Sequence, residues 1–490
     1  MRTKLPLRSA SVVALSAAMA ACTVGPNYHR PPAAISPHFK EAEGWRAAQA
    51  VEAIDRGAWW SVFNDSDLDA LEKRVEVNNQ NIAQAVAAYR EAHQITAAAR
   101  ASFFPTLGAT GQVHDQYSGS KGGSSVTTAS GAIISGGGSN SAITTLSAAL
   151  NASWTPDLWG SIRREVESDV ATAQADAGQI ANARLSAQGE LATDYYELRI
   201  NDATQQVLRD TVTADEKFLT LTKNQYAAGT MDRAAIISAQ TQVLGVQAQL
   251  VDLQAARAQD EHAIAILIGV APSELTIAPI AKSEFDVPVP PVTVPSDLLE
   301  RRPDIAVAER NMAAANATIG VKVAAFYPTL PLTASYSYSG GSNLGNLFSA
   351  TNELWTAGAS LTDTIVDFGA RRAQVRAARA AYDEQIAVYR QTVLSAFQGV
   401  EDNLAQLRVF QQEADVRKQA LDAANYAVQL TINEYKAGTV DYTTVITAQT
   451  TALTDAQAVL TVEQERLVAS VALIQNLGGG WQANELPKKG

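Results

Sequence analysis

The sequence predicts an all-α protein with a small transmembrane β-barrel portion, built from two tandem repeats of helix–strand–strand–long helix–helix. First, a segment of the chain returns after 209 residues. Second, residues 162–226 contain no proline and carry apolar side chains at the three- and four-residue spacing of a packed helix. Third, short segments such as 143–154 alternate apolar and polar residues, which is typical of a strand with one polar face.

The repeat is clearest at a tight turn. The run Asn-Gln-Tyr-Ala-Ala-Gly-Thr at 224–230 returns as Asn-Glu-Tyr-Lys-Ala-Gly-Thr at 433–439, a shift of 209 residues. Upstream, Phe-Phe-Pro-Thr-Leu at 103–107 returns as Phe-Tyr-Pro-Thr-Leu at 326–330, a shift of 223 residues. The first copy therefore holds 14 additional residues (223 − 209), in an interval that contains a Gly/Ser-rich stretch at 118–141, expected to be a loop. Two copies of one structure can differ in this way.

Each repeat is expected to contain the same elements in the same order. In the first repeat, the helix, two strands, long helix and last helix are predicted at about 67–102, 105–117, 143–156, 162–226 and 233–268. In the second repeat they are predicted at about 296–325, 329–339, 354–366, 371–435 and 442–476. The expected domains are a signal peptide, a lipidated linker with an equatorial segment, repeat 1, an inter-repeat linker, repeat 2 and a C-terminal tail, at 1–21, 22–66, 67–270, 271–295, 296–480 and 481–490.

The predicted lengths separate a membrane part from a part outside it. At ~1.5 Å per residue, the 65 residues of 162–226 form a helix of roughly 97 Å, far longer than a bilayer core of ~30 Å. The strands have the ~10-residue length that crosses a membrane. Because bacterial barrels begin at about eight strands, a chain with four must associate with copies of itself. Strand counting leaves a dimer with eight strands and a trimer with twelve both open.

Composition and motifs exclude several function classes. The net charge of −12 argues against nucleic acid as a partner. The five histidines, at 29, 38, 93, 114 and 262, have no metal-binding spacing, and the chain has no phosphate-binding loop, dinucleotide fingerprint or nucleophile elbow. We therefore expect no catalytic residues, no metal and no cofactor, and the protein is not predicted to be an enzyme.

The N-terminus predicts export and a lipid anchor. Three basic residues precede a short apolar run at 11–21, as in a secretory signal peptide. The residues Met-Ala-Ala-Cys at 19–22 resemble a bacterial lipobox, and Cys22 is the one cysteine of the chain. We expect a covalent lipid on Cys22, whose acyl chains hold the N-terminus in a bilayer. The alternative is an ordinary cleaved signal with an incidental cysteine.

Four segments resemble the TolC family of outer-membrane efflux channels, in particular its lipoprotein branch that partners resistance-nodulation-division (RND) pumps. They are 22–28, 295–305 with Leu-Leu-Glu-Arg-Arg-Pro-Asp, 319–328, and the paired Tyr-x-x-Gly-Thr turns. This resemblance spans essentially the whole mature chain. It implies a homotrimer in the outer membrane of a Gram-negative bacterium, with a shared twelve-stranded β-barrel and a periplasmic α-helical tunnel.

The function implied by this resemblance is a passive exit duct for drugs or other toxic small molecules. A periplasmic membrane-fusion adaptor and an inner-membrane RND pump are the implied partners, besides outer-membrane lipid. Within the same fold, the alternative is the outer-membrane duct of a type I protein secretion system. A lipid-anchored coiled-coil scaffold without a pore is a second alternative.

One group of candidate residues lies where strands meet helices, at the expected junction of barrel and tunnel. Its members are Phe104, Pro105, Trp154, Trp159, Gly160, Tyr327, Pro328, Phe368 and Gly369. The aromatic residues are expected either to form a girdle at the lipid interface or to fill the junction. The two glycines are expected to permit a sharp bend.

A second group surrounds the two tight turns, which the resemblance identifies as the periplasmic tip and gate. Its members are Tyr226, Gly229, Thr230, Asp232, Tyr435, Gly438, Thr439, Asp441, Thr444 and Thr447. The glycines are predicted to be left-handed, and Thr230 and Thr439 are N-cap candidates of the next helices. The alternative is plain helix-hairpin chemistry. Where the family commonly has acidic residues at the constriction, this chain has Thr444 and Thr447.

Overall fold

The structure is a computed structural model that describes residues 23–32, 38–42, 58–118, 125–127, 133–135, 141–280, 285–288 and 298–487. The predicted signal peptide, Cys22, most of the Gly/Ser-rich stretch and much of the two linkers lie outside these residues. The chain divides into two compact units. The first comprises Met1–His29, His93–Val170 and Ala313–Tyr382, and the second comprises Arg30–Ala92, Ala171–Met312 and Asp383–Gly490. Each unit draws segments from both repeats.

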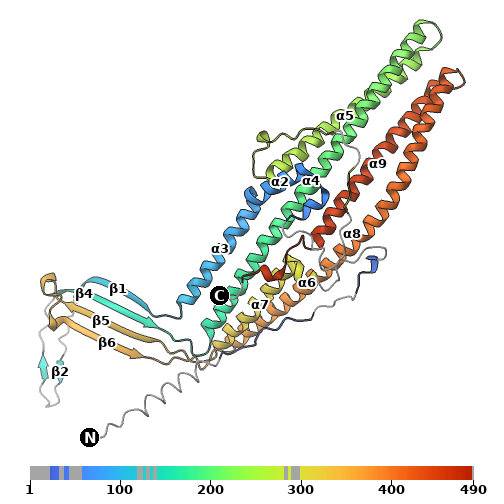
Figure 1. The fold of residues 1–490 in the computed structure, drawn as a ribbon. Helices are drawn as coiled ribbons and strands as arrows, with labels where there is room; N and C mark the ends of the chain where they lie inside the picture. The colour runs from blue at the N-terminus through green and yellow to red at the C-terminus, as the bar shows by residue number, and fades with distance from the viewer. Residues whose placement is uncertain are drawn as a thin grey trace. The chain divides into compact units, whose positions relative to one another are not determined.

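Four long helices match the predicted ranges to within one residue at each end. α4 (Ser161–Ala227) and α8 (Ala370–Lys436) have 67 residues each. α5 (Arg233–Leu267) and α9 (Tyr442–Asn476) have 35 residues each. Figure 1 shows the α4–α5 hairpin in green and the α8–α9 hairpin in orange and red. None of the helices in the described part of the chain is both long and apolar enough to cross a membrane.

The first helix of each repeat is broken, and here the predictions of single helices were wrong. Residues 67–102 form α2 (Ser66–Asn78) and α3 (Gln80–Ala101). Asn79 separates them, because its side chain accepts from the amides of Asn81 and Ile82 at 2.9 and 3.2 Å and so replaces helical hydrogen bonds. In the second repeat, α6 (Leu298–Arg301) ends before α7 (Pro303–Ala324), since Pro303 has no amide hydrogen to donate.

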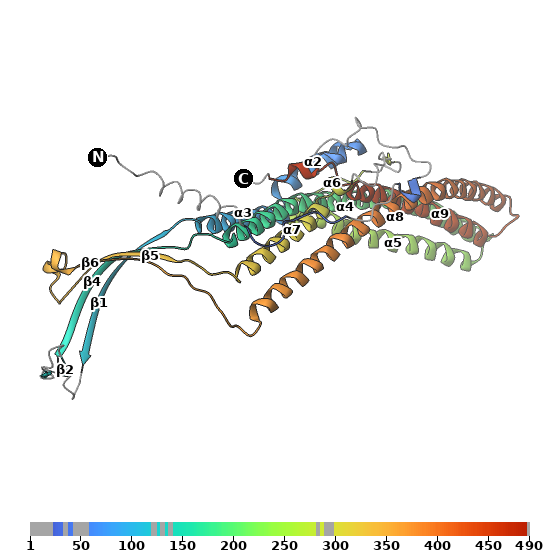
Figure 2. The ribbon, with the colours of Figure 1, turned by 90° about the horizontal axis from the view of Figure 1, so that it is seen from below.

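Four strands form an antiparallel sheet in the order β1-β4-β5-β6 (Figure 1). Figure 2 shows the same strands from a second side. Their bounds are Thr106–Ser118 for β1, Ser141–Trp154 for β4, Leu332–Gly340 for β5 and Glu353–Ala359 for β6. β2 (Ser125–Thr127) and β3 (Ile133–Ser135) pair separately. The strand predicted at 354–366 is too long, because β5 begins only at Leu332, opposite Ala359. Pro331, just before β5, has no amide hydrogen to donate to the neighbouring strand. Beyond it, the two segments are joined only by an isolated antiparallel bridge between Thr329 and Thr362.

The largest core cluster lies in the second unit. It joins the short helix η2 (Trp59–Phe63) and α2 to the middle of α4 and to the C-terminal parts of α5 and α9. Its most buried members include Trp59, Leu68, Val75, Leu191, Tyr195, Leu198, Ile264 and Leu467. A second cluster, around Ala239, Tyr435, Tyr442 and Val445, packs the two hairpins together near their turns. The second cluster fixes the position of Tyr435 beside its turn.

Candidate functional site

The four-stranded sheet has one apolar and one hydroxyl-rich face. The register places Leu107 opposite Ala152, Leu150 opposite Tyr336, and Tyr336 opposite Trp355, so these side chains share a face. The apolar face consists of Leu107, Ala109, Val113, Leu146, Ala148, Leu150, Ala152, Trp154, Leu332, Ala334, Tyr336, Tyr338, Trp355, Ala357 and Ala359. Its charged members, Asp115 and Glu353, come near strand ends. Such an exposed apolar surface suits lipid.

The opposite face of the sheet is polar but carries little charge. Its polar residues are Thr106, Thr110, Gln112, His114, Thr145, Ser147, Asn151, Ser153, Thr333, Ser335, Ser337, Ser339 and Thr356, and Ala149 and Leu354 share the face with them. Neighbouring strands exchange hydroxyl hydrogen bonds on this face, such as Thr106 to Ser153 at 2.8 Å and Ser335 to Thr356 at 2.7 Å. This hydroxyl-rich face is suited to contact with water, whereas the apolar face is suited to contact with lipid. The predicted alternation of 143–154 and 332–338 is confirmed.

The predicted junction residues fall into two groups. Trp159 donates from Nε1 to the carbonyl of Pro328 at 2.7 Å, and its ring stacks on Tyr327 with centroids 4.8 Å apart. Trp159, Tyr327 and Pro328 therefore pack together where the strands end. Trp154 donates to the carbonyl of Phe103 at 3.0 Å. The rings of Phe104 and Phe368 are exposed, by 69% and 101%, as members of a lipid-facing girdle would be.

Both bends rest on a left-handed glycine and a carboxylate. Gly160 and Gly369 have φ of 80° and 93°, a conformation that other residues adopt only with strain. Asp367 accepts from the amide of Gly369 at 2.9 Å and binds the guanidinium of Arg371 at 2.6 Å. The Arg371 hydrogen bond, with those of the two backbone amides, lowers the pKa of Asp367 to about 2. Asp157 binds Arg163 in the first repeat at 3.2 Å. Neither carboxylate was among the residues predicted from the sequence.

The segment that follows Cys22 is held firmly within the first unit. The buried Arg164 donates to the carbonyl of Val24 at 3.1 Å and to Oδ1 of Asn27 at 2.9 Å. Gly25 has φ of 94°, and a Cβ there would lie 2.5 Å from Cα of Gly320. The described part of the resemblance segment 22–28 therefore packs against the segment 319–328 through Gly25 and Gly320.

At the tight turns, the predicted glycines are left-handed but the predicted N-caps are wrong. Gly229 and Gly438 both have φ of 75°. The hydroxyls of Thr230 and Thr439 donate back to the carbonyls of Gln225 and Glu434, each at 3.0 Å, so both threonines cap the ends of the long helices. The N-caps of the next helices are carboxylates. Asp232 accepts from the amide of Ala235 at 2.9 Å and Asp441 from that of Thr444 at 3.0 Å.

The hydroxyls at the expected constriction are bonded within their own helix. Thr444 donates from Oγ1 to Asp441 at 2.7 Å, and Thr447 donates to the carbonyl of Thr443 at 2.9 Å. Hydrogen bonds from the Thr444 side chain and backbone lower the pKa of Asp441, so this carboxylate stays ionised in its role as N-cap. Thr444 and Thr447 add no charge.

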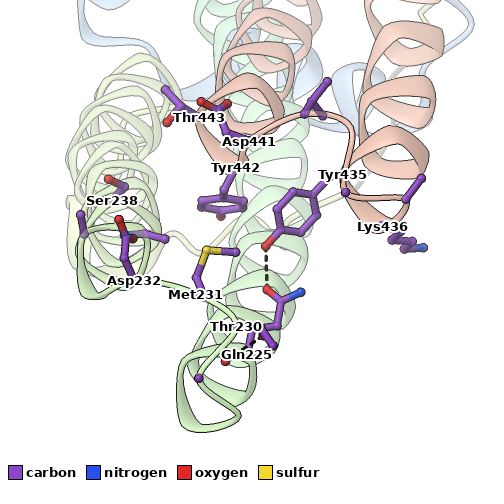
Figure 3. Close-up of a pocket in the computed structure, with 16 residues that line it drawn as sticks. Gln225, Thr230, Met231, Asp232, Ser238, Tyr435, Lys436, Asp441, Tyr442 and Thr443 are labelled. Carbon is purple, nitrogen blue, oxygen red and sulfur yellow. Dashed lines mark hydrogen bonds between the residues drawn. The ribbon is translucent and has the colours of Figure 1, made fainter.

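Two tyrosines link the hairpins beside an open cavity of about 860 Å³ (Figure 3). The hydroxyl of Tyr435 donates to Oε1 of Gln225 at 2.7 Å. The ring of Tyr442 lies 5.8 Å from that of Tyr435 and 6.2 Å from that of Phe218. Tyr226, the equivalent of Tyr435 in the first repeat, is 47% exposed instead. Gln225 was not among the residues predicted from the sequence. The one sequence feature that could have indicated it is its position directly before Tyr226, within the repeated turn motif.

The cavity is lined from both turns. Its residues include Gln225, Gly229, Thr230, Met231, Asp232, Ser238, Tyr435, Lys436, Gly438, Asp441, Tyr442 and Thr443. The mixture of carboxylates, hydroxyls and one ammonium suits contact with a polar protein surface. In the described ranges, no three His, Cys, Asp or Glu side chains come together as metal ligands.

Comparison with known proteins agrees with this geometry. The family model described as outer membrane efflux protein matches residues 71–270 and 294–479. The chain is 30% identical over 455 residues to the pyoverdine export outer membrane protein OpmQ of Pseudomonas aeruginosa, covering 92% of this chain and 94% of that protein. It is 28% identical to the probable efflux pump outer membrane protein TtgC of Pseudomonas putida, covering 95% of each.

A solved structure shows the same fold. The structure of the outer-membrane channel OprN superposes with a TM-score of 0.83 at 26% sequence identity, over 94% of this chain and 100% of that one. The match therefore includes both the strands and the hairpins. The protein belongs to the outer membrane efflux protein family.

Proposed function

We propose that three copies of this outer-membrane efflux channel close one shared β-barrel and one helical tunnel, which form the passive exit duct of a tripartite pump. The two-faced sheet carries this proposal. Its order leaves β1 and β6 with free edges in the described chain, and much of its apolar face is exposed, including Leu107, Leu150 and Trp355. Free edges must be paired, and three sheets of four strands give the twelve strands of a closed barrel.

Exposed stripes on two helices support the association of copies. On α5, Ile237, Leu244 and Val251 recur every seven residues and are exposed by 52%, 56% and 62%. On α8, Val409, Val416 and Leu430 follow the same heptad and are about half exposed or more. Heptad spacing is the pattern by which helices pack against partner helices. The copies are therefore expected to pack through α5 and α8.

The proposed assembly also includes a lipid anchor at Cys22 and an adaptor protein bound at the two tight turns. A lipid on Cys22 would anchor the protein, and the contacts of Arg164 with residues 24–27 would hold the lipidated end close to the strand-to-helix bends. The cavity between the turns is the proposed binding site of a periplasmic membrane-fusion adaptor, which connects the duct to an inner-membrane RND pump. Nucleic acid is not a partner, and the chain itself catalyses no reaction.

The proposed cargo is drugs or other toxic small molecules. OpmQ is named for export of pyoverdine and TtgC for an efflux pump, and both similarities favour a small-molecule duct over the outer-membrane duct of a type I protein secretion system. The apolar strand faces favour a pore over a coiled-coil scaffold.

The test of this function is the mass and conductance of the purified chain. In detergent it should have the mass of a trimer, and in planar bilayers it should form pores. Val416→Asp should weaken the trimer, because it places a charge in the heptad stripe. Lys418→Asp, exposed on another face of α8, is the matched control and should leave the trimer intact. A monomer that retains its full strand content would contradict the shared barrel.

A further inference from the structure

A carboxylate occupies a core position between the two hairpins. Asp215 lies on α4 and is 1% exposed, and its two oxygens have no cationic group and no well-aligned hydrogen-bond donor among the described residues. It follows Val212 by three residues and precedes Leu219 by four, so it belongs to the packed seam of α4. The clusters on either side of it join the hairpins, through Leu208 and Leu453 above and through Phe218 and Tyr442 below. Asp215 is therefore enclosed by the contact between the hairpins.

The groups that face Asp215 do not neutralise it. From α9 the facing titratable group is Tyr442, which is 4% exposed and whose hydroxyl also lacks a hydrogen-bond partner among the described residues. Burial, and then the charge of Asp215, raise the pKa of Tyr442 to about 12. From α5 the facing group is the neutral amide of Gln242. Burial raises the pKa of Asp215 to about 6, while the hydrogen-bonding amide of Gln242 has a smaller effect that lowers it.

The internal repeat provides a comparison within the same chain. The shift of 209 residues that relates the two turns carries Asp215 onto Ala424 of α8. Ala424 is 8% exposed, so a small apolar side chain fills the equivalent buried position. Packing of the long helix therefore does not require a carboxylate here. A charge without a partner at such a position opposes packing.

We propose that Asp215 is a proton-operated latch between the α4–α5 and α8–α9 hairpins. When Asp215 is protonated, the hairpins pack closely around it. When Asp215 is ionised, its charge favours separation of the hairpins, which lets water reach the carboxylate. This inference rests on the proposed function in one respect, since only there do the turns form the gate of the duct. Acid would then hold the tip closed, and neutral pH would ease its opening.

The direction and size of the effect follow from proton linkage. The carboxyl has a pKa of about 6 when packed and an ordinary value of 3.8 when exposed to water. The packed state therefore binds the proton more tightly, and its advantage is complete below the exposed value and is lost as pH rises through the packed value. The difference of about two pH units corresponds to a packing equilibrium about a hundredfold weaker at neutral pH than in acid.

Hydrogen exchange of the hairpin amides tests the latch directly. We would measure exchange of the first turns of α5 and α9 in the intact protein at pH 4, 5, 6, 7 and 8, corrected for the intrinsic rates. Protection should fall by up to about a hundredfold across this range. Asp215→Asn, which keeps the shape but cannot ionise, should remain protected at every pH. Glu216→Gln, at the exposed neighbouring position, should behave like the unaltered protein.

A second measurement reads the carboxyl itself. The infrared difference spectrum between the unaltered protein and Asp215→Asn should contain the band of a protonated carboxyl that disappears with a midpoint near pH 6. An Asp215 that is already ionised at pH 4.5, or an Asp215→Asn protein with unchanged pH dependence of exchange, would overturn the proposal. Asp215→Ala, which copies the residue of the second repeat at position 424, replaces Asp215→Asn if that variant folds poorly.

Conductance separates the latch from the gate. Planar-bilayer currents should rise with pH in the unaltered protein and not in Asp215→Asn. If hydrogen exchange follows pH as expected while the current does not, the latch stands and the assignment of the turns as the gate is wrong.

Discussion

The hydroxyl of Tyr435 lies 2.7 Å from Oε1 of Gln225, so the last turn of α8 is tied to the last turn of α4. This bond crosses between two hairpins that the repeat makes similar in sequence. The contact is nevertheless one-sided, because Tyr226 of the first repeat points to the surface and is 47% exposed. The tip of the chain is therefore less symmetric than its sequence.

Loss of the Tyr435 hydroxyl should ease opening of the tip. Tyr435→Phe removes one hydrogen bond, which contributes about 1 kcal/mol, and so should shift the balance towards separated hairpins by about fivefold. The measurement is the open probability of single channels in planar bilayers. Tyr226→Phe is the matched control, since that ring is exposed, and it should have no effect. An unchanged open probability in Tyr435→Phe would show that this bond does not hold the closed state.

Trivalent cations added from the periplasmic side should block the channel only weakly. Thr444 and Thr447 stand where carboxylates would form charged rings, and Asp441 is occupied as an N-cap. Thr447→Asp should strengthen the block, because three like charges in a narrow throat attract cations. Asp441→Asn, which still caps the helix, should remove most of the block that exists. Block currents in planar bilayers measure all three proteins, and tight block that survives Asp441→Asn would place the controlling charge elsewhere.

Palmitate should label the protein at Cys22. Radiolabelled palmitate is expected in the unaltered chain and not in Cys22→Ser, because the lipobox cysteine is the one thiol of the sequence. The variant should keep partial efflux if it is still exported, since the strands also hold the protein in the membrane. Persisting label in Cys22→Ser would contradict the assignment of the lipid site.

Replacement of Glu72 by glutamine should stabilise the protein at pH 7–8. Glu72 is fully buried and both its oxygens lack hydrogen-bond partners in the described chain. Burial, with a smaller effect of Asp69, raises the pKa of Glu72 to about 9 from an ordinary 4.5. The folded state therefore binds a proton that the unfolded state releases between these values, so stability falls as pH rises from about 4.5 to 9.

The pH dependence of thermal unfolding checks this prediction. Within that window each pH unit removes up to about 1.4 kcal/mol, and Glu72→Gln should abolish this share of the slope. Glu76→Gln, on an exposed side of the same helix, is the control and should leave the slope unchanged. Equal slopes in the unaltered protein and Glu72→Gln would mean that Glu72 is solvated in the folded state.

The main helices and strands could be predicted from the sequence because each produces a periodic spacing of apolar residues along the chain. The 67 residues of α4 and of α8 show as long helical patterns without proline, and the strand at 143–154 shows as an alternation of apolar and more polar residues. The left-handed turns at Gly229 and Gly438 follow from the need for a residue without Cβ. Such features depend on neighbours in the chain, which the sequence lists directly. The repeat reinforced every one of them.

Features that depend on a partner from a distant part of the chain were decided only by the tertiary structure. The end of β6 at Ala359 follows from where β5 begins, and the break at Asn79 is secured by its 2.8 Å bond to the carbonyl of Leu267. The N-cap role expected of Thr230 and Thr439 belongs to Asp232 and Asp441 in the structure. Tyr435 and Tyr226 share a motif but meet different neighbours. Asp215 became a buried group because a second hairpin covers it, and burial, not residue type, determines its proton affinity.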